Sequence, residues 1–239
     1  MKEPRVFVNP LRMLSLRLDR EAVRLDDQRA APPQVSLEES LITTAGKIID
    51  IIRLLSKCIV SGDESQMDRC AALADDVHQQ EKMLTKDLVS SGLKGELFKG
   101  LVRFPLRLER IGDSLETILR CCRIKAKEGI VFSDKADEEL NQLFTMLLEM
   151  MNNVRDAFKT PNKLLLESII SQSRQLTGTL ENCRLAHWER LEAGFCSPRA
   201  CSAFLAVLDS MKLINEYVQK ICITLLELGN TSRVSSEVA

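Results

Sequence analysis

The stretch Arg107-Leu-Glu-Arg-Ile-Gly-Asp113 decides how this sequence is interpreted. Glu109 and Asp113 lie four residues apart in a segment rich in helix formers, so they share one face of a helix. Like charges at this spacing repel by about 0.2–0.5 kcal/mol, which favours a bound cation, a basic partner or solvent exposure. Gly112 costs about 1 kcal/mol relative to alanine within a helix, but it permits another helix or an ion to approach closely. The stretch therefore predicts a helix with an acidic face and a point of close contact.

The composition is that of a helical globular protein. The chain has 239 residues, of which 45% are hydrophobic and only 4% aromatic, with ten glycines and seven prolines. This is enough apolar material to bury a sizeable core, and the balance of residue types favours helix over strand. A net charge of −1 provides no general attraction to nucleic acid. We expect an all-α protein of one or two domains.

The sequence contains no candidate for a membrane span or a disulfide framework. The longest apolar segment, residues 41–60, is interrupted by four charged residues and cannot cross a bilayer at low cost. The first residues do not lead into the apolar region of a signal peptide. The eight cysteines include no Cys-x-x-Cys pair, so we expect buried, reduced thiols in a cytoplasmic protein.

Hydrophobic periodicity predicts six helices in two consecutive groups of three. The first group covers about residues 37–60, 63–90 and 93–127, and the second about 134–158, 160–194 and 198–228. Pro105 lies inside the third helix and predicts a kink one turn before Glu109. Helix lengths match between the groups, and the acidic start of the first helix recurs at the start of the fourth. We therefore expect two tandem three-helix-bundle repeats, residues 36–130 and 131–230, followed by a disordered tail at 231–239.

Residues 1–35 form a separate amphipathic segment and linker. Asn9-Pro10 can cap a short helix with an apolar stripe that begins at Leu11, and Ala31-Pro32-Pro33 then acts as a linker. The helix either packs on the bundle as an extra element or serves as a docking or membrane-proximal helix. The second interpretation uses its basic residues, Arg12, Arg17, Arg20 and Arg24.

Three features together resemble the PhoU family: the duplicated three-helix unit, the Arg107–Asp113 stretch, and Leu185-Ala-His-Trp-Glu-Arg-Leu-Glu-Ala-Gly-Phe-Cys-Ser197. The last stretch is most similar to the PhoU-type domain at the cytoplasmic end of sodium/phosphate cotransporter family proteins. The resemblance covers about residues 36–230. It implies a bacterial regulator of phosphate uptake and signalling, not an enzyme, in the cytoplasm or peripheral at the inner membrane. The implied partners are a phosphate transporter, of the sodium/phosphate cotransporter or ABC type, a sensor kinase, and a second copy in a homodimer.

The resemblance also implies a metal site, because many PhoU proteins bind iron, zinc or similar ions through paired Glu/Asp-x-x-x-Asp motifs. In the first repeat the third-helix motif is Glu109 and Asp113, whereas the second-helix motif falls on Ala74 and His78. His78 and Asp75 are additional ligand candidates, but a multinuclear cluster lacks oxygen ligands. One divalent or ferric ion is therefore expected in the first repeat.

In the second repeat the same motifs fall on residues without a carboxylate. They are Arg174 and Gly178 on the second helix, and Met211 and Asn215 on the third. A cationic side chain opposes a metal ion, so no metal is expected in this repeat.

Three other interpretations stay open. Glu109 and Asp113 can form a solvated acidic stripe that pairs with neighbouring arginines. The chain can be a helical scaffold or adaptor that kept a degenerate PhoU fold and lost the ligand. A carboxylate-bridged metal enzyme is a remote alternative, since Asp75-x-x-His78 is the only approximation to a Glu-x-x-His motif. His187 and Trp188, near the predicted helix end at Gly194, are interpreted as contacts that close the bundle.

Overall fold

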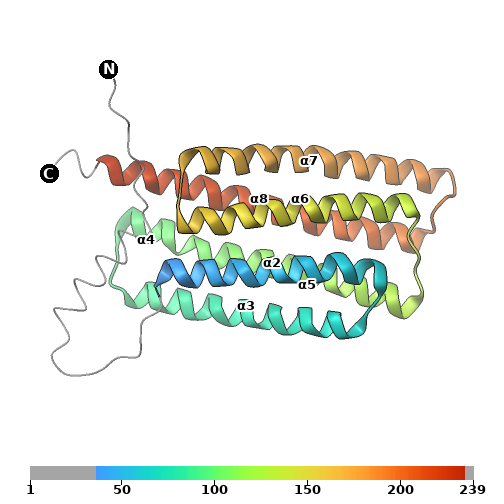
Figure 1. Ribbon diagram of the computed structural model, residues 1–239, viewed down its shortest axis with the longest axis horizontal. Helices are drawn as coiled ribbons and strands as arrows, with labels where there is room; N and C mark the ends of the chain where they lie inside the picture. The colour runs from blue at the N-terminus through green and yellow to red at the C-terminus, as the bar shows by residue number, and fades with distance from the viewer. Residues whose placement is uncertain (1–35, 235–239) are drawn as a thin grey trace, which may run out of the picture.

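The computed structural model describes residues 36–234, and no strand occurs among them. The helices, labelled as in Figure 1, are α2 (Leu37–Ser61), α3 (Glu64–Ser90), α4 (Gly95–Leu101), α5 (Arg103–Glu128), α6 (Asp134–Lys159), α7 (Lys163–Glu192) and α8 (Pro198–Val234). The predicted all-α fold class is confirmed.

The long helices form two three-helix units that lie side by side (Figure 1). Helices α2, α3 and α5 make the first unit, and α6, α7 and α8 make the second. Helix α2 packs against α6, and α5 packs against α8, so one hydrophobic core runs through both units. The prediction of two tandem three-helix repeats is confirmed.

Local sequence explains where the helices of the first unit begin and end. Ser36 and Glu39 form a capping box at the start of α2, with reciprocal hydrogen bonds of 3.1 and 3.2 Å between side chain and backbone. Gly62 ends the helix with φ +67°, a left-handed conformation that glycine adopts without strain. The Asp63 carboxylate then accepts hydrogen bonds from two backbone amides at the start of α3.

The predicted third helix is two helices, not one kinked helix. Helix α4 ends at Leu101, Val102 forms the turn, and α5 begins at Arg103. The cause is Pro105, which has no N–H to donate and whose ring would clash with the carbonyl of Leu101. Val102 itself keeps helical angles, with φ −64° and ψ −17°, and α5 packs against both α3 and α8.

The second unit differs from the prediction at its ends. Asn162, not Thr160-Pro161, caps α7, where its side chain accepts a hydrogen bond of 2.8 Å from the amide of Leu164. Helix α8 continues to Val234, past the predicted end at Leu228 and into the segment predicted as a tail. The predicted helix and linker within residues 1–35 and the last five residues of the tail lie outside the described residues.

No helix in the described part of the chain combines the length and apolar character needed to cross a bilayer.

Candidate functional site

The candidate site begins where α5 touches α3. A Cβ atom at Gly112 would lie only 3.3 Å from Cγ1 of Val77, so the glycine allows the two helices to pack closely. This contact brings the next residue of α3, His78, opposite Glu109. The Nδ1 atom of His78 lies 3.0 Å from Oε1 of Glu109, and the two side chains are 48% and 19% exposed. The close contact predicted for Gly112 is therefore a contact with a helix.

The other two predicted ligands do not join this pair. Asp113 is half exposed, and its Oδ2 atom lies 3.2 Å from Nη1 of Arg110 on the same helix. Asp75 is exposed on α3, and its neighbour Asp76 pairs with Lys47 of α2 at 3.0 Å. The structure thus brings His78 and Glu109 together and leaves Asp75 and Asp113 apart from them.

This geometry does not fit the metal centre that the resemblance implies. Donor atoms 3.0 Å apart can occupy neighbouring positions around an ion with bonds of about 2.1 Å. Protein zinc sites, however, use at least about three protein ligands. Within residues 36–234 no group of three or more His, Cys, Asp or Glu side chains is placed to hold a metal ion. Any ion at the His78–Glu109 pair would take its remaining ligands from water.

The burial pattern shows which residues of the second unit correspond to the site. The same spacing of buried positions occurs on α5 and α8, at Leu108, Ile111, Leu115 and Ile118, and at Met211, Ile214, Val218 and Ile221. This register pairs Glu109 with Lys212, and Gly112 with Asn215. It also pairs Asp113 with Glu216. The sequence-based assignment of Met211 and Asn215 to the carboxylate positions is therefore one residue out of register.

Helices α3 and α7 show the same kind of correspondence. Their buried positions are Met67, Cys70, Ala74 and Val77 on α3, and Leu166, Ile169, Ser173 and Leu176 on α7. In this register Thr177 is the residue of α7 that corresponds to His78. The sequence-based alignment assigned Gly178 to that position, one residue further along the chain. The second unit has Thr177 and Lys212 in place of the His78–Glu109 pair, so it lacks both metal-ligating side chains at this position.

A buried amide holds α7 and α8 together at the equivalent point. The Nδ2 atom of Asn215 donates hydrogen bonds of 2.9 Å to the carbonyl oxygen of Ser173 and to the hydroxyl of Thr177. In the first unit Gly112 has no side chain, so α5 packs closely against α3. In the second unit the Asn215 side chain connects α8 to α7 by hydrogen bonds. The two units therefore hold the corresponding helices together by different contacts.

Arg107 has a structural role that the sequence did not reveal. Its Nη1 atom donates hydrogen bonds to the carbonyl oxygen of Lys220, at 2.6 Å, and to the hydroxyl of Thr224, at 2.7 Å. Burial, together with the nearby charge of Arg103, lowers the pKa of Arg107. The first residue of the acidic stretch thus connects α5 to α8 and does not pair with the carboxylates.

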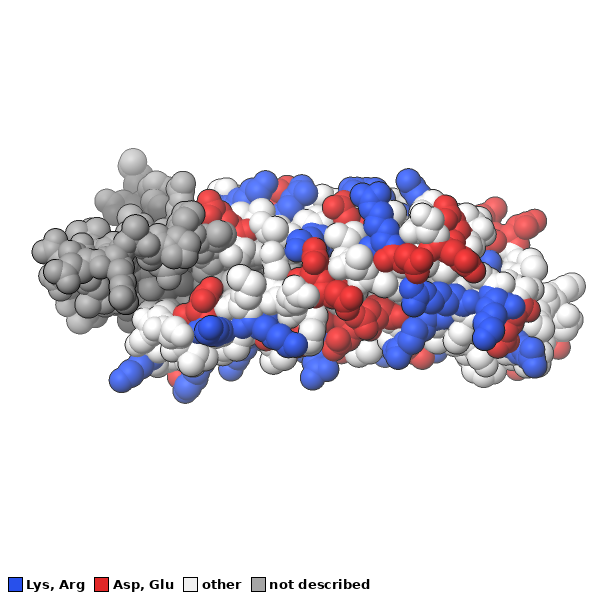
Figure 2. Space-filling view, turned by 90° about the horizontal axis from the view of Figure 1, so that it is seen from below, with Lys and Arg blue, Asp and Glu red and all other residues white. Residues whose placement is uncertain are grey.

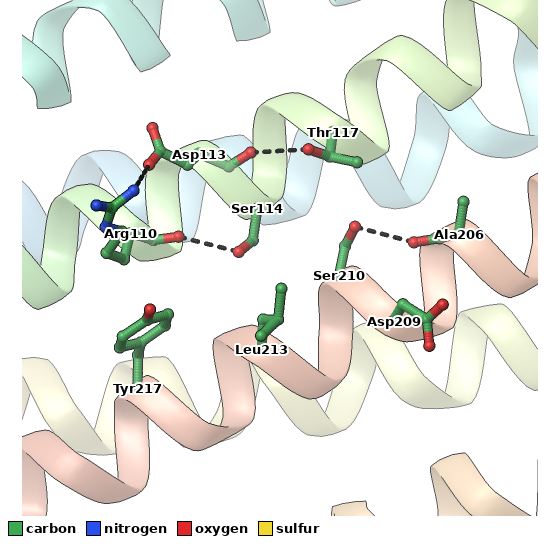
Figure 3. A pocket seen from close by; sticks show the side chains of 9 residues that line it. All are labelled: Arg110, Asp113, Ser114, Thr117, Ala206, Asp209, Ser210, Leu213 and Tyr217. Carbon is green, nitrogen blue, oxygen red and sulfur yellow. Dashed lines mark hydrogen bonds and ion pairs between the residues drawn. The ribbon is translucent and has the colours of Figure 1, made fainter.

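A groove between α5 and α8 starts beside Asp113 (Figure 3). It has a volume of about 410 Å³ and is walled by Arg110 and Asp113 of α5 and by Leu213 and Tyr217 of α8. The hydroxyls of Ser114 and Ser210 donate to backbone carbonyls of their own helices at 2.9 Å. The lining of the groove therefore contains small side chains whose donors are already satisfied.

The groove continues along the same two helices. A second hollow of about 500 Å³ shares Ala206 with the first and extends past Ile124 to Pro198. Leu213 and Ile124 are nearly half exposed along this path. The groove is lined by small residues and bordered by exposed aliphatic side chains of α5 and α8. A surface of this kind can bind the apolar face of another helix.

Figure 2 shows the edge of the molecule formed by α3, seen from below. Acidic side chains gather near the middle of this view, and Lys and Arg side chains lie on both sides of them. This mixed distribution is unlike the continuous basic surface of a protein that binds nucleic acid.

His187 lies in the core of the second unit. It is buried, and its ring stacks on Phe204 of α8, with 4.2 Å between centroids and 15° between planes. Trp188 is nearly half exposed. Of the two residues predicted to close the bundle, His187 is the one enclosed between helices.

No family model matches the sequence, and no curated protein matches it. Among solved structures, the phosphate transport system regulatory protein PhoU from Streptococcus pneumoniae is similar with a TM-score of 0.73 and 15% identity, covering 90% of this chain and 96% of that one. PhoU from Pseudomonas aeruginosa has a TM-score of 0.72 and 17% identity, covering 82% and 96%.

A PhoU-like protein from Shewanella oneidensis has a TM-score of 0.59 and 9% identity, and the match covers 82% of this chain and 100% of that one. At these identities the similarity concerns the fold, and it extends over nearly the whole length of the solved proteins. The chain has the fold of the PhoU proteins.

Proposed function

We propose that this protein is a PhoU-like regulator of phosphate uptake that restrains a phosphate transporter, or its associated sensor kinase, by direct contact at the cytoplasmic face of the membrane. The observation that carries the proposal is the similarity to the Streptococcus pneumoniae regulator, which covers 90% of this chain and 96% of that one. The Arg107–Asp113 stretch supports the proposal independently, because its amino-acid sequence resembles the PhoU family.

The contact surface that we propose is the groove between α5 and α8. Asp113 lies on one wall and Asp209 on the other, and both carboxylates are more than half exposed at 51% and 62%. Each carboxylate also has an arginine neighbour, so the rims carry both charges. A helix with an apolar stripe and charged residues of both signs beside it would place its stripe on Leu213 and its charges at the rims. Binding there requires no chemical step, so the proposed mechanism is contact and not catalysis.

The test is phosphate uptake in cells that carry or lack the gene. We expect the deletion to increase uptake of labelled phosphate in phosphate-rich medium, and the wild-type gene to restore the restraint. A Leu213→Glu variant should fail to restore it, because it places a charge in the apolar part of the groove. Leu164→Glu is the matched control, since it makes the same change at a residue 74% exposed on α7 and outside the groove. Unchanged uptake in the deletion strain would overturn the proposed function.

The second candidate is a helical scaffold that has kept the fold and lost the ligand. The presence of Thr177 and Lys212 in place of the His78–Glu109 pair favours it, because the second unit has no metal-binding side chains at that position. The two candidates differ in their response to phosphate. A scaffold would bind its partner equally in phosphate-rich and phosphate-poor cells, whereas a regulator would bind more in one condition, which co-purification from both kinds of cell would show.

A further inference from the structure

The sequence that precedes α2 contains an apolar stripe. Its members recur at steps of three and four, the spacing of one helix face: Leu11, Leu14, Leu18, Ala22 and Leu25. A helix of residues 10–25 would be about 24 Å long. Helices of this length are marginal in water by themselves, because their own hydrogen bonds barely repay the cost of nucleation. The segment therefore needs an apolar surface on which to fold.

The groove between α5 and α8 is such a surface. Its two hollows extend from Arg110 to Glu128 on α5, which corresponds to about 27 Å of helix. Leu213 and Ile124 are 47% and 48% exposed along it. Figure 3 shows the Leu213 side chain pointing from α8 towards α5. The groove thus matches a helix of residues 10–25 in length and in apolar character.

The connection between this segment and α2 is long enough to reach the groove. A Cβ atom at Gly62 would lie 3.7 Å from Cβ of Ala126, so the end of α2 lies beside the end of α5, and the two helices run in the same direction (Figure 1). At about 1.5 Å per residue, Arg110 then lies about 15 Å beyond the level of Ser36 along the bundle. Residues 26–35 span up to about 33 Å, enough for this distance and for passing one helix about 10 Å wide.

This reach determines the direction of the docked helix. Its end next to the linker must lie towards the start of α5, so the helix runs antiparallel to α5 and in the same direction as α8. Charges of both signs border its apolar stripe, with Arg17 and Glu21 on one side and Arg12 and Asp19 on the other. Because the helix is right-handed, Arg17 and Glu21 then face the α5 rim, and Arg12 and Asp19 face the α8 rim.

The charges on the rims match these borders. Leu213 lies across the groove from the turn of α5 that carries Asp113 (Figure 3). If Leu18 contacts Leu213, Arg17 lies beside Asp113, whose carboxylate is 51% exposed. The arginine of the other border, six residues before Leu18, lies near Asp209, four residues before Leu213. Each rim thus offers a carboxylate to an arginine of the segment.

We propose that residues 10–25 form a helix that docks in the groove between α5 and α8 of their own chain and competes there with the protein partner. The competition rests on the proposed function, whereas the docking rests on the groove and on the sequence of the segment alone. A short tether gives the segment an effective concentration in the range of about millimolar, so a weak contact is enough to occupy the groove.

Hydrogen exchange of the full-length protein, followed by mass spectrometry of its peptides, tests the docking. We expect the backbone amides of residues 14–25 to be protected in the wild type. Leu18→Glu and Leu213→Glu should each speed their exchange by at least about tenfold, because either change places a charge in the apolar contact. Leu164→Glu is the matched control on α7, where the side chain is 74% exposed outside the groove, and should leave the exchange unchanged.

The pair of variants keeps the test decisive, because Leu18→Glu lies outside the bundle and cannot prevent it from folding. Fast exchange of residues 14–25 in the wild type would overturn the proposal, including the case in which only vesicles of anionic phospholipid slow it. Protection that persists in a folded Leu213→Glu variant would place the segment elsewhere. Protection that rises with protein concentration would mean that the segment docks on a second copy, which also overturns the proposal.

Phosphate uptake in cells tests the competition separately. A Leu18→Glu variant should leave the groove open to the partner, so uptake of labelled phosphate in phosphate-poor medium should fall below that of the wild type. Equal uptake in the variant and the wild type would overturn the competition. Unchanged uptake in the deletion strain would instead overturn the proposed function, and the exchange rates of the purified protein would still decide whether the segment docks.

Discussion

Arg107 of α5 donates a hydrogen bond of 2.7 Å to the hydroxyl of Thr224 on α8, across the boundary between the two three-helix units. The same guanidinium nitrogen reaches the carbonyl oxygen of Lys220. The arginine that opens the acidic stretch therefore connects the two units, whereas Glu109 faces His78 of α3 and Asp113 is half exposed beside the groove between α5 and α8.

Replacing Arg107 by Met should lower the free energy of unfolding by about 1–3 kcal/mol, because the hydrogen-bonding groups of α8 lose a charged donor. Urea denaturation followed by circular dichroism measures this change. The control is Arg110→Met, which breaks a half-exposed ion pair to Asp113 and should cost less than about 1 kcal/mol. Equal effects of the two substitutions would contradict the role assigned to Arg107.

Glu139→Gln should be one of the most destabilising single changes in the second unit. The carboxylate accepts two hydrogen bonds from Arg190, and both side chains are largely buried. Removing one charge leaves the other without compensation, at a cost of roughly 3–5 kcal/mol. Glu138→Gln makes the same change one residue earlier in an exposed pair with Lys135, and should cost less than about 1 kcal/mol. Thermal and urea unfolding of both variants provide the comparison.

The protein should lose stability below about pH 6.5 through His187. Burial and Arg190 lower the pKa of His187 in the folded state from its ordinary value of 6.5. Between the folded and unfolded values the unfolded chain binds a proton that the folded chain does not, so stability falls as the pH falls through this window. The loss is at most about 1.4 kcal/mol per pH unit.

Urea denaturation at several pH values, for the wild type and for His187→Gln, isolates this contribution from that of the carboxylates. The variant should show a shallower loss of stability as the pH falls below 6.5, the ordinary pKa of the histidine. Parallel curves for the two proteins would mean that His187 binds its proton equally in both states.

The all-α fold and its two three-helix repeats were accessible from the sequence for physical reasons. Apolar periodicity fixes which face of each helix is buried, and residues such as Gly62 and Asp63 mark the helix ends through local backbone chemistry. Pro105 predicts a kink near the observed break at Val102, but the sequence does not show whether the helix continues past the missing hydrogen bond.

The site was less accessible, because its contacts depend on the rotation of one helix against another. A register error of one residue turns a buried position into an exposed one, and this is how Met211 was matched to Glu109. The sequence does not predict that Arg107 connects α5 to α8. One of its hydrogen-bond acceptors is a main-chain carbonyl, and every residue has one, so no residue type marks this contact.

The metal content of the purified protein should be well below one equivalent after dialysis. His78 and Glu109 are the two predicted ligands that the structure brings together, and an ion held by two side chains exchanges more readily than one held by three or four. Mass spectrometry of protein purified without a tag or chelator measures this. Near-stoichiometric metal that is lost in Glu109→Gln would contradict the prediction and restore the metal site that the resemblance implies.

Gly100→Ala should destabilise the contact between α4 and α8. A Cβ atom at this position would lie 2.7 Å from Cδ2 of Leu228, so either the leucine or the helix must move. Overpacking of this kind costs about 1–3 kcal/mol, which at its lower end equals and otherwise exceeds the roughly 1 kcal/mol that alanine gains over glycine in a helix. Gly178→Ala is the matched control, because its added Cβ would meet nothing within 4 Å apart from its chain neighbours and the backbone of its own helix, and it should be stabilising. The two variants should therefore shift the urea midpoint in opposite directions, and a shift in the same direction would show that Leu228 moves aside at little cost.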